Sequence, residues 1–227
     1  MGDKVPKVVE AQRFVLRDAS GTVRAELSAV EGEAGLVVLS PSGKFRAELT
    51  AVEDGAGLVI FGPRGEVRVA VGVDADGEPS LNLCDGDPAS RAGLTRLTDG
   101  AWAVCLSGPG GQGRVMLTVE PDGAAAVYLN DQDRKARASL VVDSDGTPSL
   151  CLWDREGNPR TTMQLRRDGT PAFALYDKYG RPTWSRPRST EHVTTPEKLR
   201  KGAPRSRAEE LGQLTYDWWL HRKAKKG

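Results

Sequence analysis

The sequence predicts an all-β protein built from tandem repeats, followed by a short α-helical tail. Three observations carry this prediction: an arginine that recurs every 22 or 23 residues, apolar residues that alternate with other residues, and Asp/Gly loops between the alternating segments. Self-similarity at a fixed short period is the signature of a repeat architecture. The recurring arginines are Arg24, Arg46, Arg68, Arg91, Arg114, Arg137 and Arg160, and Thr183 takes this place in an eighth unit.

Each unit predicts two β-strands. A Leu-x-Leu pair such as Leu150 and Leu152 forms the first strand, and apolar residues one and three positions after the arginine form the second. Apolar alternation over 4–8 residues, bounded by Gly and Asp, is typical of strands with one apolar face. We therefore expect tandem 22–23-residue two-strand repeats in a repetitive antiparallel β-meander over residues 13–185, after an N-terminal arm at 1–12.

The loop within each unit has the pattern Asp-x-x-Gly, as in residues 154–157. Asp favours the first position of a type I turn, and Gly accepts the left-handed conformation that closes it. Taken as a four-residue hairpin loop, it pairs Val127 with Ala138 and Leu129 with Ala136. All four of these side chains then share one face.

The loop between units has the pattern x-Asp-Gly, as in residues 144–146. A three-residue loop with a left-handed Gly at its end pairs Leu140 with Leu150 and Ala138 with Leu152. Both loops thus place the apolar residues on the same face of a continuous meander. A one-residue slip would turn each strand over, so the agreement supports this register.

The apolar face needs a cover. Sixteen side chains of the Leu-x-Leu pairs, at ~1.5–3 kcal/mol each, represent ~25–50 kcal/mol of burial. This exceeds the ~5–15 kcal/mol by which whole domains are stable. We expect the meander to curl on itself or to coil like a β-solenoid, whereas packing in a homo-oligomer or on another protein stays open as an alternative.

The recurring arginines are predicted to form a stripe on the second face, across from residues such as Cys105 and Cys151. Such a stripe could bind a polyanion, but residues 1–185 hold 21 Lys and Arg against 26 Asp and Glu, which disfavours phosphate binding. We interpret the arginines as structural, with stems that cover apolar neighbours and heads that pair with nearby acidic residues.

An apolar patch on the second face is confined to the first three units. It indicates either a contact surface or a region that is covered on both faces. The patch consists of Val15, Val37, Leu39, Val59 and Phe61.

No catalytic, metal-binding or cofactor-binding constellation is predicted. The two histidines, His192 and His221, lie outside the repeats, and the three cysteines fall in different units without a C-x-x-C pair. Three cysteines and the absence of an apolar segment near Met1 lead us to expect a reducing, cytoplasmic location.

The C-terminal residues differ from the repeats in composition. Residues 186–205 are predicted to be a basic linker with a short helical turn, and the capping box Ser206–Glu209 predicts a helix over 206–227. Aromatic and basic residues of this helix are predicted to dock on a protein partner or a larger complex, a membrane surface or a nucleic acid being the weaker alternatives. The candidate docking residues are Leu211, Leu214, Tyr216, Trp218, Trp219, Leu220, Arg222 and Lys223.

These features together predict a non-catalytic scaffold, a repetitive β body docked to a larger assembly through its C-terminal helix. Two other classes remain open. The chain could form a homotrimeric fibre or spike whose Leu faces meet on the axis. It could also be a carbohydrate- or polymer-binding module that uses exposed aromatic residues of the second face, Tyr128, Trp153 and Tyr176.

Overall fold

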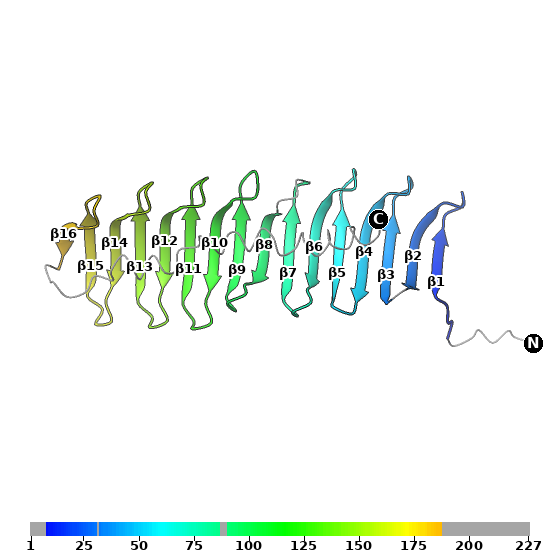
Figure 1. Cartoon of the computed structure of the whole chain (residues 1–227), viewed down its shortest axis with the longest axis horizontal. Coiled ribbons are helices and arrows are strands. Elements are labelled where there is room, and N and C mark those ends of the chain that lie inside the picture. Colours follow the sequence, from blue (N-terminus) through cyan, green and yellow to red (C-terminus); the bar gives the residue numbers. More distant parts are fainter. Residues whose placement is uncertain (1–7, 31, 87–89, 188–227) are drawn as a thin grey trace, which may run out of the picture. The chain divides into compact units, whose positions relative to one another are not determined.

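The computed structural model describes residues 8–30, 32–86 and 90–187. Its 16 strands are all antiparallel and follow one another in sequence order in one open sheet (Figure 1). The predicted all-β meander of two-strand repeats is therefore confirmed. The predicted C-terminal helix lies outside the described residues.

The strands are β1 Arg13–Arg17, β2 Val23–Val30, β3 Glu33–Leu39, β4 Phe45–Val52, β5 Gly55–Phe61, β6 Val67–Val73, β7 Pro79–Cys84, β8 Ser90–Arg96, β9 Trp102–Ser107, β10 Gly113–Val119, β11 Ala125–Asn130, β12 Ala136–Val142, β13 Pro148–Trp153, β14 Pro159–Leu165, β15 Pro171–Tyr176 and β16 Pro182–Arg186.

The chain forms two compact regions that divide after Pro79, the first residue of β7. The first region contains β1–β6, and the second contains the rest of β7 and β8–β16. Within each region every strand pairs with its neighbours in sequence, and no described strand folds back over either face of the sheet. The expected self-curling and solenoid-like coiling are not confirmed, since a meander of short hairpins has no crossover that could bring a strand over the sheet. The described residues contain no helix of the length and hydropathy needed to cross a membrane.

The loops form as their Asp and Gly residues predict. In the loop after β13, the N–H of Gly157 donates to the carbonyl of Asp154 at 3.1 Å, and the N–H of Asp154 donates to the carbonyl of Asn158 at 3.0 Å. The Asp154 carboxylate also accepts from the N–H groups of Glu156 and Asn158. Gly157 has a φ of 83°, in the left-handed region that Gly tolerates.

The predicted register is confirmed for the loop between units. Leu140 faces Leu150, and Ala138 faces Leu152. The predicted register across the loop within the unit is wrong, because Leu129 faces Ala138 and Val127 faces Leu140. The difference is two residues, an even number, so each apolar side chain still lies on the predicted face.

A β-bulge in the hairpin within each repeat explains this difference, whereas a hairpin that joins two repeats, such as β12–β13, has no such break. In the β11–β12 hairpin Leu129 faces Ala138 whereas Asn130 faces Ala136, which leaves Arg137 as the extra residue. The same break occurs in all eight hairpins within repeats. The extra residue is the repeat arginine in the first seven hairpins and Thr183 in the eighth.

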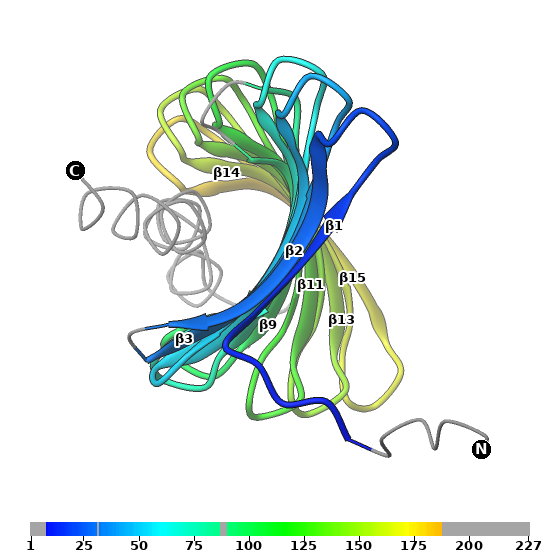
Figure 2. The ribbon, with the colours of Figure 1, turned by 90° about the vertical axis from the view of Figure 1, so that its right-hand side faces the viewer.

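The arginines therefore do not lie across from the residues that the sequence suggested. Cys151, for example, faces Thr162, two positions after Arg160. A bulge increases the right-handed twist of its strands. Figure 2 shows the resulting twist within β7–β16, where β9, β11, β13 and β15 are successively rotated.

The Arg134 loop offers a test of turn conformation. Arg134 has a φ of 60° at the position that Gly takes in the other described loops within units. We expect Arg134→Gly to be more stable than Arg134→Ala by about 1 kcal/mol, because both lose the side chain and only Gly adopts this φ without strain. Urea unfolding of the two variants measures the difference.

Arg155 provides the matched control, since it lies in the corresponding loop of the next repeat and its φ is not positive. There the order should be reversed, because Gly loses more backbone entropy than Ala on folding. The same order at both positions would contradict the role of the left-handed conformation.

Candidate functional site

The face that carries the Leu-x-Leu pairs, here called the leucine face, is exposed. In β1–β6 nine of its large apolar side chains keep 39–64% of their surface exposed, and in β7–β16 sixteen keep 36–53%. The nine are Phe14, Leu16, Leu27, Leu36, Val38, Leu49, Ile60, Val71 and Val73. The sixteen are Leu81, Leu83, Leu94, Trp102, Leu106, Leu117, Val119, Leu129, Leu140, Val142, Leu150, Leu152, Met163, Leu165, Leu175 and Trp184.

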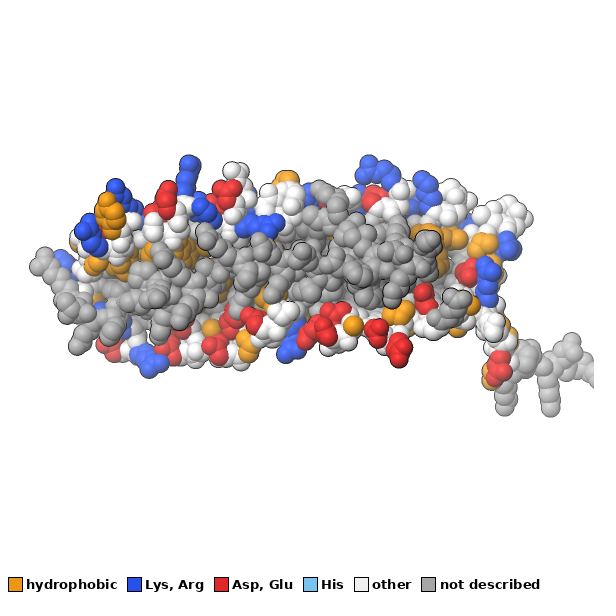
Figure 3. Space-filling model, viewed as in Figure 1, with side chains coloured by type: hydrophobic (Ala, Val, Ile, Leu, Met, Phe, Trp, Pro, Cys, Tyr) orange, Lys and Arg blue, Asp and Glu red, His pale blue; other side chains and the backbone are white. Residues whose placement is uncertain are grey.

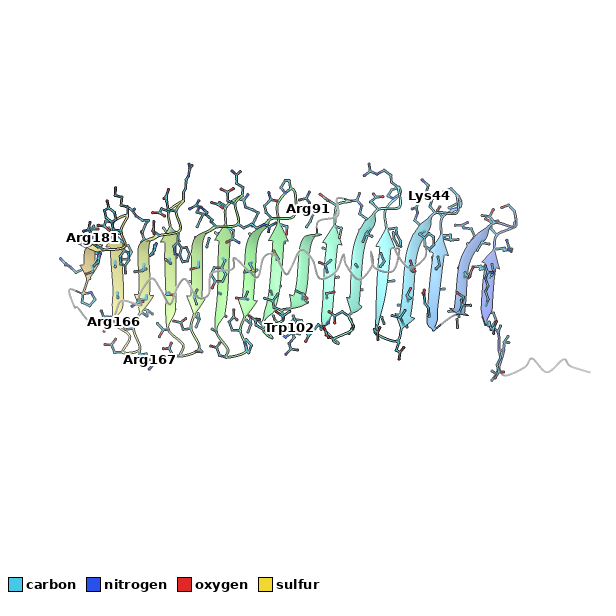
Figure 4. The ribbon with its side chains drawn as sticks, in the orientation of Figure 1. Lys44, Arg91, Trp102, Arg166, Arg167 and Arg181 are labelled. Atoms are coloured by element: carbon cyan, nitrogen blue, oxygen red, sulfur yellow. The ribbon has the colours of Figure 1, made fainter. Side chains whose placement is uncertain are left out.

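The leucine face is also almost free of charge. The strand register places only two charged residues of the described strands on it, Arg96 beside Trp102 and Arg186 on the terminal strand. Figure 3 shows charged side chains along both loop edges of the sheet. Within β7–β16, Figure 4 shows Arg91 and Arg181 at one loop edge and Arg166 and Arg167 at the other.

The second face of β7–β16 is buried. A cluster around Tyr128 includes Cys105, Met116 and Ala126, all at most 8% exposed. Many side chains of this face are small, and its polar residues are mostly hydroxyl or amide groups. The buried members with polar side chains include Asn82, Thr95, Thr118, Asn130, Ser139, Ser149, Thr162 and Gln164.

The aromatic residues of this face offer no open platform. Tyr128 is 5% exposed, Trp153 is 8% and Tyr176 is 7%. The side chains of neighbouring strands explain part of this burial: Trp153 faces Pro159, and the hydroxyl of Tyr176 lies 3.3 Å from that of Thr162. The expectation that these three aromatics are exposed is wrong, because alternation predicts a face but not how closely its residues are packed.

The apolar patch of the first three units is not uniformly accessible. Val15 is 36% exposed, and Val37 and Leu39 are half-buried. Val59 and Phe61 are buried, with 4% and 8% of their surface exposed. The ring of Phe61 meets that of Phe45 edge-on, with centroids 6.0 Å apart. That this apolar patch is a contact surface stays a prediction.

The bulge arginines bind backbone carbonyls at the end of the neighbouring strand. Arg46 donates to the carbonyl of Gly62 at 2.7 Å, and Arg114 donates to that of Asn130 at 2.9 Å. Arg24, Arg91 and Arg137 make the equivalent contact with Leu39, Gly108 and Asp154.

Most of these arginines also pair with an acidic residue of their own hairpin loop. Arg24 lies 3.6 Å from Asp18, and Arg160 lies 3.5 Å from Asp154. Arg24, Arg91 and Arg137 make both kinds of contact and thus join their own loop to the next one. These contacts support the structural interpretation of the stripe.

The loop carboxylates are held in their charged form by similar contacts. The hydroxyl and the N–H of Thr147, together with the Arg167 guanidinium, lower the pKa of Asp145 to about 2. The N–H of Arg181 and its guanidinium lower the pKa of Asp177. These carboxylates therefore stabilise the loops in which they lie.

The three cysteines differ in their burial. Burial raises the pKa of the Cys151 thiol to about 12, and it also raises the pKa of Cys105. Cys84 is half-buried, and burial together with the neighbouring Asp85 raises its pKa. Among the described residues no three His, Cys, Asp or Glu side chains form a group that could hold a metal ion.

The predicted docking residues Leu211, Leu214, Tyr216, Trp218, Trp219, Leu220, Arg222 and Lys223 lie outside the described residues, as do both histidines. Trp102 is a leucine-face residue that the repeat pattern alone did not reveal. It precedes Val104 by two positions, so extending the alternation of this strand toward its start would have placed it there.

Comparison with solved structures gives distant likenesses. No family model matches the chain, and no curated protein matches it. One similar solved structure is the TCP domain of SAS-4 (dCPAP) from Drosophila melanogaster in complex with a proline-rich motif of Ana2 (dSTIL), at 12% identity and a TM-score of 0.41. The match covers 76% of this chain and 97% of that domain.

A second similar structure is the TCP10 domain of Danio rerio CPAP in complex with a peptide of STIL. It is 13% identical, with a TM-score of 0.30 and coverage of 76% of this chain and 98% of that domain. Both domains thus bind a peptide of a partner protein. The likenesses are too weak to transfer that function to this chain.

Arg137 tests the structural role of the bulge arginines. We expect Arg137→Ala to lower the free energy of unfolding by about 1–2 kcal/mol, because it removes charge-assisted hydrogen bonds to the carbonyl of Asp154 and the carboxylate of Asp131. Urea unfolding measures the loss. The loop variant Arg155→Ala should stay within ~0.5 kcal/mol of the wild type, and equal losses would contradict the assigned contacts.

Thiol labelling tests the burial of the second face. At pH 8 in native buffer, we expect an alkylating reagent to modify Cys84 well before Cys105 and Cys151, because both of the latter are buried. Peptide mass spectrometry follows the three sites separately. In urea all three should react at similar rates, and rapid native labelling of Cys151 would show that this face is open.

Proposed function

We propose that the chain is a non-catalytic scaffold for protein–protein interaction and that the leucine face is its binding surface. The observation that carries this proposal is the set of large apolar side chains exposed on one nearly uncharged face of the sheet. The largest apolar patch of an ordinary monomer covers ~300–600 Å², and larger patches mark sites of interaction. The sixteen side chains in β7–β16 alone would reach the upper value at ~40 Å² each.

The chemistry of the leucine face favours a protein over other ligands. A nucleic acid or another polyanion requires basic side chains, and the two arginines on this face lie on separate strands, β8 and β16. A carbohydrate requires polar groups around an exposed aromatic platform, whereas the exposed Trp102 and Trp184 lie on a face of large apolar residues. Tyr128, Trp153 and Tyr176 of the second face are buried. The core of a protein interface, in contrast, is apolar and poor in charge.

The C-terminal residues are proposed to supply a second contact. Residues 186–227 hold 11 Lys and Arg against 5 Asp and Glu, opposite in sign to the balance of residues 1–185. Tyr216, Trp218 and Trp219 stand within four positions of one another, and Tyr and Trp are common anchors of protein interfaces. The supporting evidence for this contact is the sequence.

Oxidation of methionine tests whether a protein occupies the leucine face. Met163 lies on that face at 51% exposure, and Met116 lies on the second face at 1%. In a native extract of the cells that express the chain, we expect peroxide to oxidise Met163 at least ~5-fold more slowly than in the purified chain at nanomolar concentration, because a bound protein excludes the reagent. Mass spectrometry of the two methionine peptides gives both rates.

Leu150→Lys should restore the fast oxidation of Met163 in the extract, because Leu150 faces Met163 across the β13–β14 pair. The exposed loop variant Ser144→Lys adds the same charge and should leave the protection unchanged. A chain that ends at residue 205 separates the two proposed contacts, since Met163 should stay protected in it. Equal oxidation of Met163 in the extract and in the purified chain would refute the leucine face as a binding surface.

A further inference from the structure

One row of side chains on the leucine face of β7–β16 alternates in size with a regular period. Along this row, a leucine on the first strand of each hairpin faces a residue on the second strand that is smaller or β-branched in the first four hairpins. Strands lie ~4.8 Å apart, so these leucines recur every ~9–10 Å. The facing pairs are Leu83 and Ala92, Leu106 and Val115, Leu129 and Ala138, and Leu152 and Thr161.

These leucines are equally prominent. Leu83, Leu106, Leu129 and Leu152 are 43–47% exposed, whereas the four residues that face them are half-buried. The row is therefore a series of projections with a hollow between each two. Its period comes from the repeat itself and not from a local irregularity.

We propose that a second copy of this chain covers the leucine face, with the leucines of one copy seated in the hollows of the other. This inference rests on the proposed function, because it names the protein that occupies the face. A second copy has the same period and the same length of row, so a displacement by one strand brings its leucines over the hollows of the first. Facing sheets pack in this way, ~10 Å apart, with interdigitated side chains.

The area and the charge of the face suit such a pairing. A stable interface of standard size buries ~800 Å² on each partner, which the sixteen exposed side chains of β7–β16 reach at ~50 Å² each. Residues 1–185 carry a net negative charge, but the strand register places no acidic residue of the described strands on the leucine face. Repulsion between two copies is therefore screened by solvent and salt.

Sedimentation of the purified full chain tests this proposal. At micromolar concentration the wild type should have twice the 24.4 kDa mass of one chain. The double variant Leu106→Lys, Leu129→Lys should raise the dissociation constant at least ~100-fold, because it brings two ammonium groups into an apolar interface. The two leucines are exposed in one chain, so the circular dichroism of the β-sheet should be unchanged.

Two further variants separate fitted packing from general stickiness. Gln132→Lys, Ser144→Lys adds the same two charges in exposed loops and should remain a dimer. Ala138→Trp adds apolar surface but fills one hollow, so it should weaken the dimer ~10-fold or more, whereas an unspecific apolar association would become stronger.

A monomeric wild type, or a mass of three chains, would overturn the pairing of two copies. If the purified chain is monomeric while Met163 is protected in the cell extract, another protein occupies the leucine face. In that case this inference fails and the proposed function stands. If Met163 is unprotected as well, both fail.

Discussion

A sheet that is one layer thick has no second layer of described strands to cover its faces, and this constraint governs the rest of the structure. Hairpin loops and neighbouring strands hold the register of its strands. The repeat arginine serves this purpose at a bulge, where it binds the carbonyl at the end of the next strand, as Arg114 does with Asn130. Asp and Gly close the loop beside it, as in residues 154–157. Each repeat therefore contains a hairpin loop together with the bulge position next to it, which an arginine occupies in seven of the eight repeats.

The same constraint makes the two faces of the sheet distinct. In β7–β16, the second face consists mainly of small residues and buried aromatics, and the leucine face consists of large apolar residues that remain exposed. Apolar surface of this extent is unfavourable in water at ~25 cal/mol per Å², so a sequence that maintains it through every repeat pays a continuing cost in solubility. A bound protein removes that cost, and this is the physical basis of the proposed function.

The sequence predicted the strands, the loops and the membership of each face, because these depend on residues close together in the chain. Alternation of period two places Leu150 and Leu152 on one side, whatever the distant contacts are. The bulge at Arg137 was not predictable from the apolar pattern. It shifts the pairing of the two strands by two residues, and a shift of two leaves every side chain on the same face. The burial of Tyr128 and Trp153 was missed for a related reason, because it depends on neighbours that spacing does not specify.

The two edge strands of the sheet, β1 and β16, have features that disfavour pairing with another chain. The outermost strands have exposed backbone groups that could pair with another chain, and natural proteins protect such edges with charge, proline or shortness. The strand β1 has five residues, with Arg13 and Arg17 at its ends, and β16 also has five and begins with Pro182, which has no N–H to donate. On the leucine face, the described strands carry only two charged residues, Arg96 and Arg186. Because the edges are guarded and the face is not, association is expected through the face.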